Sequence, residues 1–231
     1  MHTLRNKLTT LAVALTMAAS AHAQVDRPLR ILVGFPAGGS ADLAARLIGE
    51  RMATELKQPV VIENKPGAGG RLAADVLKNA PADGSVWMLA PIVVPVLAPL
   101  VFAKLPYNAS TDFAPVAPVA NYQFGLSVNA SHPAKTVSEL VKWAKANPAQ
   151  ANFGSPSPGS LPHFFGVMIS NGAQLDMVHV PFNGGAPMMN ALIGSQITTA
   201  VDTVVDQIEM HRVGKTRILA TSGSSRSPLL V

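Results

Sequence analysis

The sequence predicts an α/β protein of two lobes, each built on a mainly parallel sheet that is flanked by helices. Short apolar runs alternate along the chain with segments whose apolar residues recur at helical spacing. Glycine-rich turns join several of these runs to the helical segments that follow, which is typical of parallel strands connected by helices. A span with six prolines, residues 91–118, separates two such regions.

The first strand–turn–helix unit opens the chain after residue 28. Residues 29–35 are apolar apart from Arg30 and predict a buried strand, and Gly38 and Gly39 form the turn. The helix that follows carries an apolar face, which we expect to be buried. This face comprises Leu43, Leu47, Ile48 and Met52.

The turn of this unit, residues 35–40, is called the first loop. Backbone N–H groups at the start of a helix lack partners and lie at the positive end of the helix dipole, so anions bind there readily. The first loop has no lysine or arginine, and it matches neither the P-loop nor the dinucleotide-binding pattern. It therefore predicts either a neutral anion site or simply a tight turn.

The rest of the first region continues the alternation. A strand at 59–63 is followed by the glycine turn 64–70 and by a helix with Leu72, Val76 and Leu77 on one face. Asp83-Gly84 predicts a turn and 86–90 a further strand. We expect residues 91–118 to be irregular, because prolines break regular structure.

The second region begins near residue 124. Thr136 and Glu139 form a capping box, and Ser160 is placed to cap a helix with Pro162 in its first turn. Expected strands are 124–128, 152–154, 177–181, 197–201 and 217–221, and expected helices are 136–147, the segment after Ser160, 188–193 and 204–211.

The N-terminal residues predict an export signal rather than part of the fold. Arg5 and Lys7 precede an apolar run that is too short to span a bilayer, and Ala21-His22-Ala23 resembles a cleavage site. We expect residues 1–23 to be a signal peptide, cleaved after Ala23. The chain has no cysteine, which excludes disulfides, thiolate metal sites and a cysteine-linked lipid anchor.

Composition limits the classes of partner. Removal of Arg5 and Lys7 lowers the formal charge from +5 to +3, and the basic residues are scattered, so nucleic acid is not expected. Residues 86–103 are the most apolar later stretch, but prolines interrupt them, so no membrane insertion is expected once the signal is removed. The histidines form no metal-binding pattern, and no cofactor is expected.

Three strand–glycine–helix junctions offer backbone donors, at 37–40, 157–160 and 183–186. Ser160 and His163 lie one helical turn apart and Asp202 ends a strand, so an exported Ser/His hydrolase is an alternative interpretation. The chain lacks the G-x-S-x-G elbow, and a capping serine near a histidine favours a structural role.

Other polar and aromatic residues leave alternatives open. His179 lies in an apolar strand and is interpreted as a core residue. Asp202 either orients a ligand amine or a loop amide, or caps the next turn. Phe35 and Phe182 either pack on a ligand or fix their own loops.

Four motifs in order resemble the periplasmic solute receptors of tripartite tricarboxylate transporters, often called Bug receptors. Together they span essentially all of the chain after the signal, and four motifs at the expected spacings are specific where one would be weak. They are residues 35–39, residues 63–70, residues 154–156 with Gly159, Ser160 and His163, and residues 178–187.

The resemblance implies a two-lobed, type II-like periplasmic binding protein fold, with residues 24–120 plus 217–231 in the first lobe and 121–216 in the second. It implies a monomeric, non-enzymatic receptor. Such a receptor would close on a small carboxylate, an organic acid or acidic amino acid, and deliver it to membrane transporter subunits. The relevant segments are the first loop, residues 155–163 (the second loop) and residues 183–186 (the third loop).

The implied ligand-binding residues follow from these loops. They are Phe35, Ala37, Gly38, Gly39, Ser40, Ser155, Ser157, Gly159, Ser160, His163, Asn183, Gly184 and Asp202. Asn183 stands where many relatives carry a basic residue, which implies a different acid. Relatives continue beyond the position of Val231, so an incomplete first lobe is expected, and a non-functional or sensory receptor fragment is a further alternative.

Overall fold

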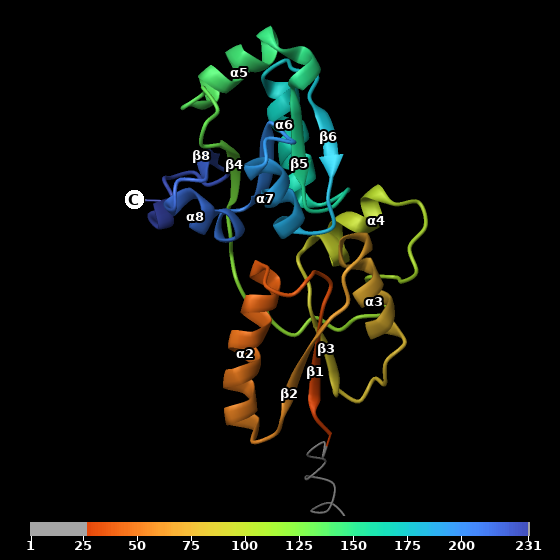
Figure 1. The fold of residues 1–231 in the computed structure, drawn as a ribbon. Coiled ribbons are helices and arrows are strands. Elements are labelled where there is room, and N and C mark those ends of the chain that lie inside the picture. Colours follow the sequence, from red (N-terminus) through yellow and green to blue (C-terminus); the bar gives the residue numbers. More distant parts are fainter. Residues whose placement is uncertain (1–26, 231) are drawn as a thin grey trace, which may run out of the picture.

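The computed structural model describes residues 27–230, which form two lobes with a sheet in each (Figure 1). The expected signal peptide, residues 1–23, and its cleavage site lie outside the described residues. None of the helices in the described part of the chain is both long enough and apolar enough to cross a membrane.

The first lobe is a three-stranded parallel sheet with the order β2-β1-β3. Its central strand is apolar apart from Arg30, and Leu32 and Val33 are fully buried. Helices lie on the sheet in Figure 1, as short crossovers between parallel strands require. The elements are β1 (Leu29–Val33), α2 (Ser40–Leu56), β2 (Val60–Asn64), η2 (Ala68–Gly70), α3 (Arg71–Lys78) and β3 (Val86–Leu89).

The buried face of α2 differs from the predicted one. Leu43 and Leu47 were expected inside but are 50% and 58% exposed, whereas Ala45 and Gly49 are buried. A Cβ on Gly49 would lie 3.1 Å from the Ile62 side chain, so small residues let the helix approach the sheet closely. The expectation for Leu43 and Leu47 was therefore wrong, because spacing does not reveal which face approaches closest.

Residues 91–118 contain more helix than expected. A π-helical turn, η3 (Val93–Leu97), leads into α4 (Ala98–Val101). Pro99 fits because the first turn of a helix needs no N–H donor. The Tyr107 hydroxyl donates to the Val94 carbonyl at 2.7 Å and anchors the segment that follows.

The second lobe holds a five-stranded mixed sheet with the order β6-β5-β7-β4-β8. Strand β5 is parallel to β6 and β7, and β4 is antiparallel to β7 and β8. The strands are β4 (Phe124–Asn129), β5 (Asn152–Ser155), β6 (Val178–Pro181), β7 (Thr199–Thr203) and β8 (Thr216–Thr221). The helices are α5 (Val137–Ala146), η4 (Pro148–Gln150), α6 (Leu161–Gly172), α7 (Gly185–Ile193), α8 (Val204–Arg212) and η5 (Pro228–Leu230).

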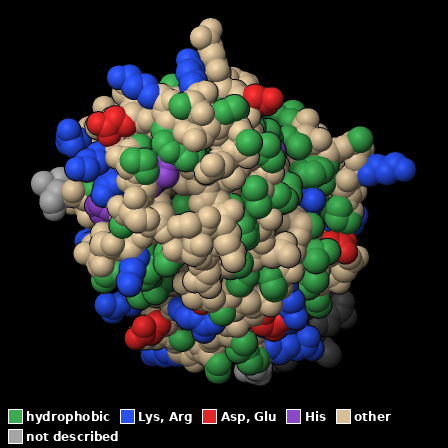
Figure 2. Space-filling model, turned by 45° about the horizontal axis from the view of Figure 1, so that its top comes forward, with side chains coloured by type: hydrophobic (Ala, Val, Ile, Leu, Met, Phe, Trp, Pro, Cys, Tyr) green, Lys and Arg blue, Asp and Glu red, His purple; other side chains and the backbone are tan. Residues whose placement is uncertain are grey.

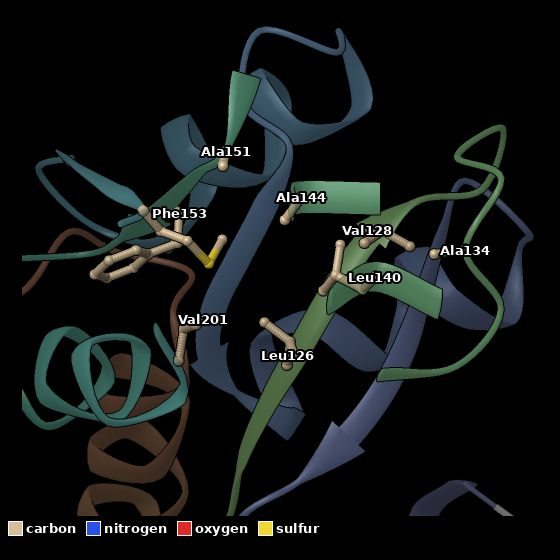
Figure 3. Packing of buried hydrophobic residues seen from close by; sticks show 9 residues of the cluster. Leu126, Val128, Ala134, Leu140, Ala144, Ala151, Phe153 and Val201 are labelled. Atoms are coloured by element: carbon tan, nitrogen blue, oxygen red, sulfur yellow. The ribbon is translucent and has the colours of Figure 1, made fainter. Parts of the chain in front are cut away.

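The main core of the second lobe lies between its sheet and the helices α5 and α6. Figure 3 shows Leu126 and Val128 of β4 facing Leu140 of α5, with Phe153 and Val201 beside them. These side chains are at most 2% exposed, so the sheet is held to its helices mainly by apolar burial.

Strand β8 belongs to the second lobe and not to the first lobe, where it was expected. The sequence analysis assigns residues 217–231 to the first lobe, but β8 pairs with β4 of the second sheet. The guanidinium of Arg217 donates to the carbonyls of Ala130 and Ala134, at 3.1 Å each, and fixes this edge strand. The other lobe boundaries stay predictions.

The capping box at the start of α5 is confirmed. The Glu139 N–H donates to Thr136 Oγ1 at 3.2 Å, and the Thr136 N–H donates to the Glu139 carboxylate at 3.2 Å.

Candidate functional site

The three loops meet at the junction of the two lobes. The Gly184 N–H donates to the Pro156 carbonyl at 2.9 Å, which joins the second and third loops. A Cβ on Gly184 would lie 3.0 Å from the Pro36 ring, so the third loop also touches the first. Gly184 has a φ of 105°, which L side chains rarely adopt.

The first lobe approaches the second loop at two further points. A Cβ on Gly69, in the turn before α3, would lie 2.7 Å from Ser157 Oγ. A Cβ on Gly159 would lie 2.8 Å from the Phe102 ring, just after α4. The second loop is thus approached by Gly69 of the motif 63–70 and by Phe102, which lies outside the motifs of the sequence.

The first loop is shaped by Asp42, a residue that the sequence analysis did not select. Its buried carboxylate accepts from the Gly38 N–H at 2.9 Å, from Arg46 Nε at 2.9 Å and from Asn64 Nδ2 at 3.0 Å. The hydrogen bond from Arg46 lowers the pKa of Asp42 to about 2, although burial acts in the opposite direction. The loop therefore has a fixed shape before any ligand binds.

The N-terminus of α2 already faces a carboxylate, that of Asp206 in the second lobe. Asp206 accepts from the Ser40 N–H and from Ser40 Oγ, both at 2.8 Å, and from Thr203 Oγ1 at 2.7 Å. The sequence predicts an anion at this position, and in this structure the anion is a side chain of the chain itself. An acidic residue three positions after Thr203 was the available signal, since Thr203 caps α8.

The hydroxyl groups of Ser155 and Ser160 already have partners in the second loop and in β6. Ser155 Oγ lies 2.7 Å from His179 Nε2. Ser160 Oγ donates to the Ser157 carbonyl at 2.6 Å and accepts from the His163 N–H at 3.4 Å, which confirms its capping role. These bonds fix the loop at the start of α6.

Two histidines stack beneath this loop. The rings of His163 and His179 have centroids 3.9 Å apart. Burial lowers the pKa of both, and the pKa of His179 falls to about 4, with a smaller contribution from His163. Both are neutral at pH 7, and the packed position of His179 matches its interpretation as a core residue.

The arrangement does not support the hydrolase alternative. His163 Nδ1 accepts from the Gly159 N–H at 3.1 Å, so this nitrogen is held by the loop. The Ser160 hydroxyl donates to a backbone carbonyl rather than to the His163 ring. The contact between Ser160 and the His163 ring that the hydrolase alternative needs is therefore not formed.

Asp202 is buried at the end of β7, with 3% of its surface exposed. Its Oδ1 accepts from the Thr203 N–H at 2.8 Å, and its Oδ2 has no partner among the described residues. Burial, and then the charge of Asp206, raise the pKa of Asp202 well above its usual value. Its partner is the backbone N–H of the next residue, at the end of β7, and its contact with a ligand stays a prediction.

The remaining predicted residues divide by position. Ala37, Gly38 and Asn183 are exposed, whereas Gly184 is buried. Phe35 packs in the core of the first lobe, and the aromatic side chain of the third loop, Phe182, packs against the core near α7. Both side chains thus pack within their own lobes, and their contact with a ligand stays a prediction.

Charged side chains do not form a single basic or acidic surface on the face shown in Figure 2, where the two signs are interspersed around the margin. Among the described residues, no group of three or more acidic, histidine or cysteine side chains is arranged to hold a metal ion.

Comparison with known proteins places this geometry in a family. The sequence profile of the tripartite tricarboxylate transporter family receptors matches residues 44–230. The UPF0065 protein in the gbd 5′ region of Cupriavidus necator is 36% identical over 225 residues, which cover 93% of this chain and 66% of that protein. The chain thus spans about two thirds of the length of this curated relative.

Two solved structures are also similar. MatC from Rhodopseudomonas palustris, with bound malate, is 30% identical with a TM-score of 0.80, over 87% of this chain and 69% of that one. R. palustris Rpa4515, with adipate, is 29% identical with a TM-score of 0.84. The match covers 87% of this chain and 68% of that one.

These likenesses confirm the α/β periplasmic binding protein fold that the sequence predicts. They also confirm the predicted non-enzymatic class, since the family profile is that of receptors. The chain therefore belongs to the tripartite tricarboxylate transporter receptor family.

Proposed function

We propose that this chain is a periplasmic receptor that binds a small carboxylate between its lobes and delivers it to the membrane subunits of a transporter. The observation that carries the proposal is the meeting of the three loops at the lobe junction, through Pro36, Pro156 and Gly184. Relatives of the same fold were solved with malate and adipate, which supports a small organic acid as the ligand class.

Helix N-termini give this junction its affinity for anions. The first and second loops lead directly into α2 and α6, and each helix start contributes roughly 0.3–1 kcal/mol toward an anion. Asp206 illustrates the chemistry, because its carboxylate accepts two hydrogen bonds from Ser40. A ligand carboxylate would use the same kind of donor without a full counter-charge in the first loop.

Calorimetry on the purified chain tests the proposal. We expect at least one member of a panel of malate, adipate, citrate, aspartate and glutamate to bind saturably and to raise the melting temperature. The corresponding diamides, which keep the size but lose the charge, serve as controls and should not bind. If the folded chain gives neither heat nor a thermal shift with any acid in the panel, the proposed function is overturned.

A further inference from the structure

Arg71, the first residue of α3, carries a guanidinium without an acidic partner among the described residues. Its Cζ lies 3.6 Å from the centroid of the Phe102 ring, so the cation rests on the aromatic face. Burial lowers the pKa of Arg71, yet an arginine remains charged at any physiological pH. A partly desolvated guanidinium in this position can still bind an anion.

Two other cations of the first lobe are paired with carboxylates. Arg46 Nε lies 2.9 Å from the carboxylate of Asp42, and Lys65 Nζ lies 3.6 Å from that of Glu63. These side chains complete ion pairs that fix the first loop and the edge of β2. Arg71 differs from them in being held by an aromatic ring rather than by a carboxylate.

The guanidinium lies at the lobe junction, close to the second loop. A Cβ on Gly69 would lie 3.7 Å from Arg71 Nη1 and 2.7 Å from Ser157 Oγ, so both side chains lie next to this glycine. The Phe102 ring beneath the guanidinium also touches the position of a Cβ on Gly159. Arg71 thus faces the loop that begins α6, although it belongs to the other lobe.

The donors predicted for ligand binding are largely occupied here. The Ser155 hydroxyl is bonded to His179 of β6, the Ser160 hydroxyl is bonded within the second loop, and Ser40 is bonded to Asp206. The guanidinium of Arg71 offers up to five N–H donors in a planar fork, which fits a carboxylate with two parallel hydrogen bonds. It is therefore the strongest open anion-binding group that the structure places at the junction.

We propose that Arg71 binds one carboxylate of the ligand and makes this receptor select dicarboxylates over the matching monocarboxylates. The inference rests on the proposed function and names a residue and a ligand class for it. Phe102 holds the guanidinium plane against which that carboxylate binds. Sequence reasoning missed Arg71, because the loop motifs stop at Gly70 and the stacking partner lies 31 residues further on.

Two matched ligand pairs test the role of Arg71 by calorimetry: malate with 2-hydroxybutyrate, and adipate with hexanoate. In wild type, we expect the dicarboxylate of at least one pair to bind more tightly. Arg71→Gln should weaken that dicarboxylate roughly 10- to 100-fold and leave the monocarboxylate within about twofold. Arg71→Lys keeps the charge but loses the planar pair of donors. Its affinity for the dicarboxylate should lie between those of wild type and Arg71→Gln.

The control Arg51→Gln removes the same charge from an exposed position of α2 and should leave all affinities unchanged. Melting curves of each variant confirm that the fold is kept. Equal weakening of both members of a pair, or no weakening at all by Arg71→Gln, overturns the role of Arg71. If wild type binds neither acid of either pair nor any acid of the wider panel, the proposed function fails instead.

Discussion

Asp42 and Asp202 show how environment sets the state of a carboxyl group at this junction. Both are buried, but Asp42 accepts hydrogen bonds from three donors, including Arg46, and its pKa is about 2. Burial, and then the charge of Asp206, raise the pKa of Asp202, and one of its oxygens has no partner among the described residues. The charged carboxylate of Asp42 shapes the first loop, whereas the raised pKa of Asp202 favours its neutral form.

The variant Asp42→Asn is expected to lower the free energy of unfolding by roughly 1–3 kcal/mol at pH 7, because charge-assisted hydrogen bonds are weakened inside the protein. The folded pKa of Asp42 lies below the unfolded value of about 3.9, so its stabilisation is present above pH 4 and is lost as pH falls through 2. Urea unfolding at pH 7 and pH 3 measures both effects.

Asp176→Asn is the matched control, since Asp176 is exposed and far from the first loop in sequence. It should change stability little at either pH. An Asp42→Asn variant that keeps wild-type stability and the wild-type acid dependence would contradict the structural role of Asp42.

Local side-chain roles were predictable from the sequence, and distant ones were not. Ser160 and Thr136 cap helices that start beside them, and the partners lie three residues away. Ser40 and Asp206 are 166 residues apart, and only the folded topology brings them together. Arg71 was missed for the same reason, because its environment comes from α4 and the second loop.

At the scale of elements, α6 packs on β5 through a glycine. A Cβ on Gly166 would lie 2.3 Å from the Phe153 ring, which is itself buried in the core of Figure 3. The helix therefore lies closer to the sheet than any side chain at this position would permit, and it carries the second loop at its start.

Gly166→Ala is expected to destabilise the chain by roughly 1–3 kcal/mol, since the new methyl overpacks the core. Chemical denaturation measures the loss. Gly172→Ala, on the same helix with nothing within 4 Å, should be neutral or slightly stabilising. Adding Phe153→Leu to Gly166→Ala should recover part of the stability, and a Gly166→Ala variant as stable as wild type would refute the close contact.

Most elements were predicted from periodicity and turn chemistry, and their bounds differ by a few residues. The apolar pattern predicted the wrong buried face for α2, because close packing on the sheet determines that face. The helix buries Ala45 and Gly49 instead of Leu43 and Leu47. The family resemblance led to β8 being expected in the first lobe, and an apolar run alone does not identify the strand with which it pairs.

For the whole molecule, the hydrogen bonds between the two lobes are concentrated at one point of the described structure. Ser40 of α2 meets Asp206 of α8, and Thr203 Oγ1 adds a longer contact to Ser40 Oγ at 3.4 Å. A binding protein that closes on its ligand must make and break such contacts. Asp206 thus ties the second lobe to the N-terminus of α2 in the first lobe.

Asp206→Ala is expected to shift the ligand-free chain toward more open arrangements, because it removes charged hydrogen bonds worth roughly 1.5–3 kcal/mol each before compensation by water. Small-angle scattering should show a larger radius of gyration than in wild type. Glu209→Ala, also on α8 and paired only with exposed Arg212, is the control and should leave the profile unchanged. Identical profiles for Asp206→Ala and wild type would show that the link does not hold the lobes.

One backbone contact in the first lobe has a consequence for ligand binding. A Cβ on Gly34, just after β1, would lie 2.4 Å from Gly70 Cα, so the start of the first loop and the residue before Arg71 touch with no side chain between them. The turn that leads to Arg71 is therefore joined to the end of β1 within the first lobe. If Arg71 binds ligand as proposed, the first carboxylate is attached to the first lobe, and lobe closure brings the second loop to it.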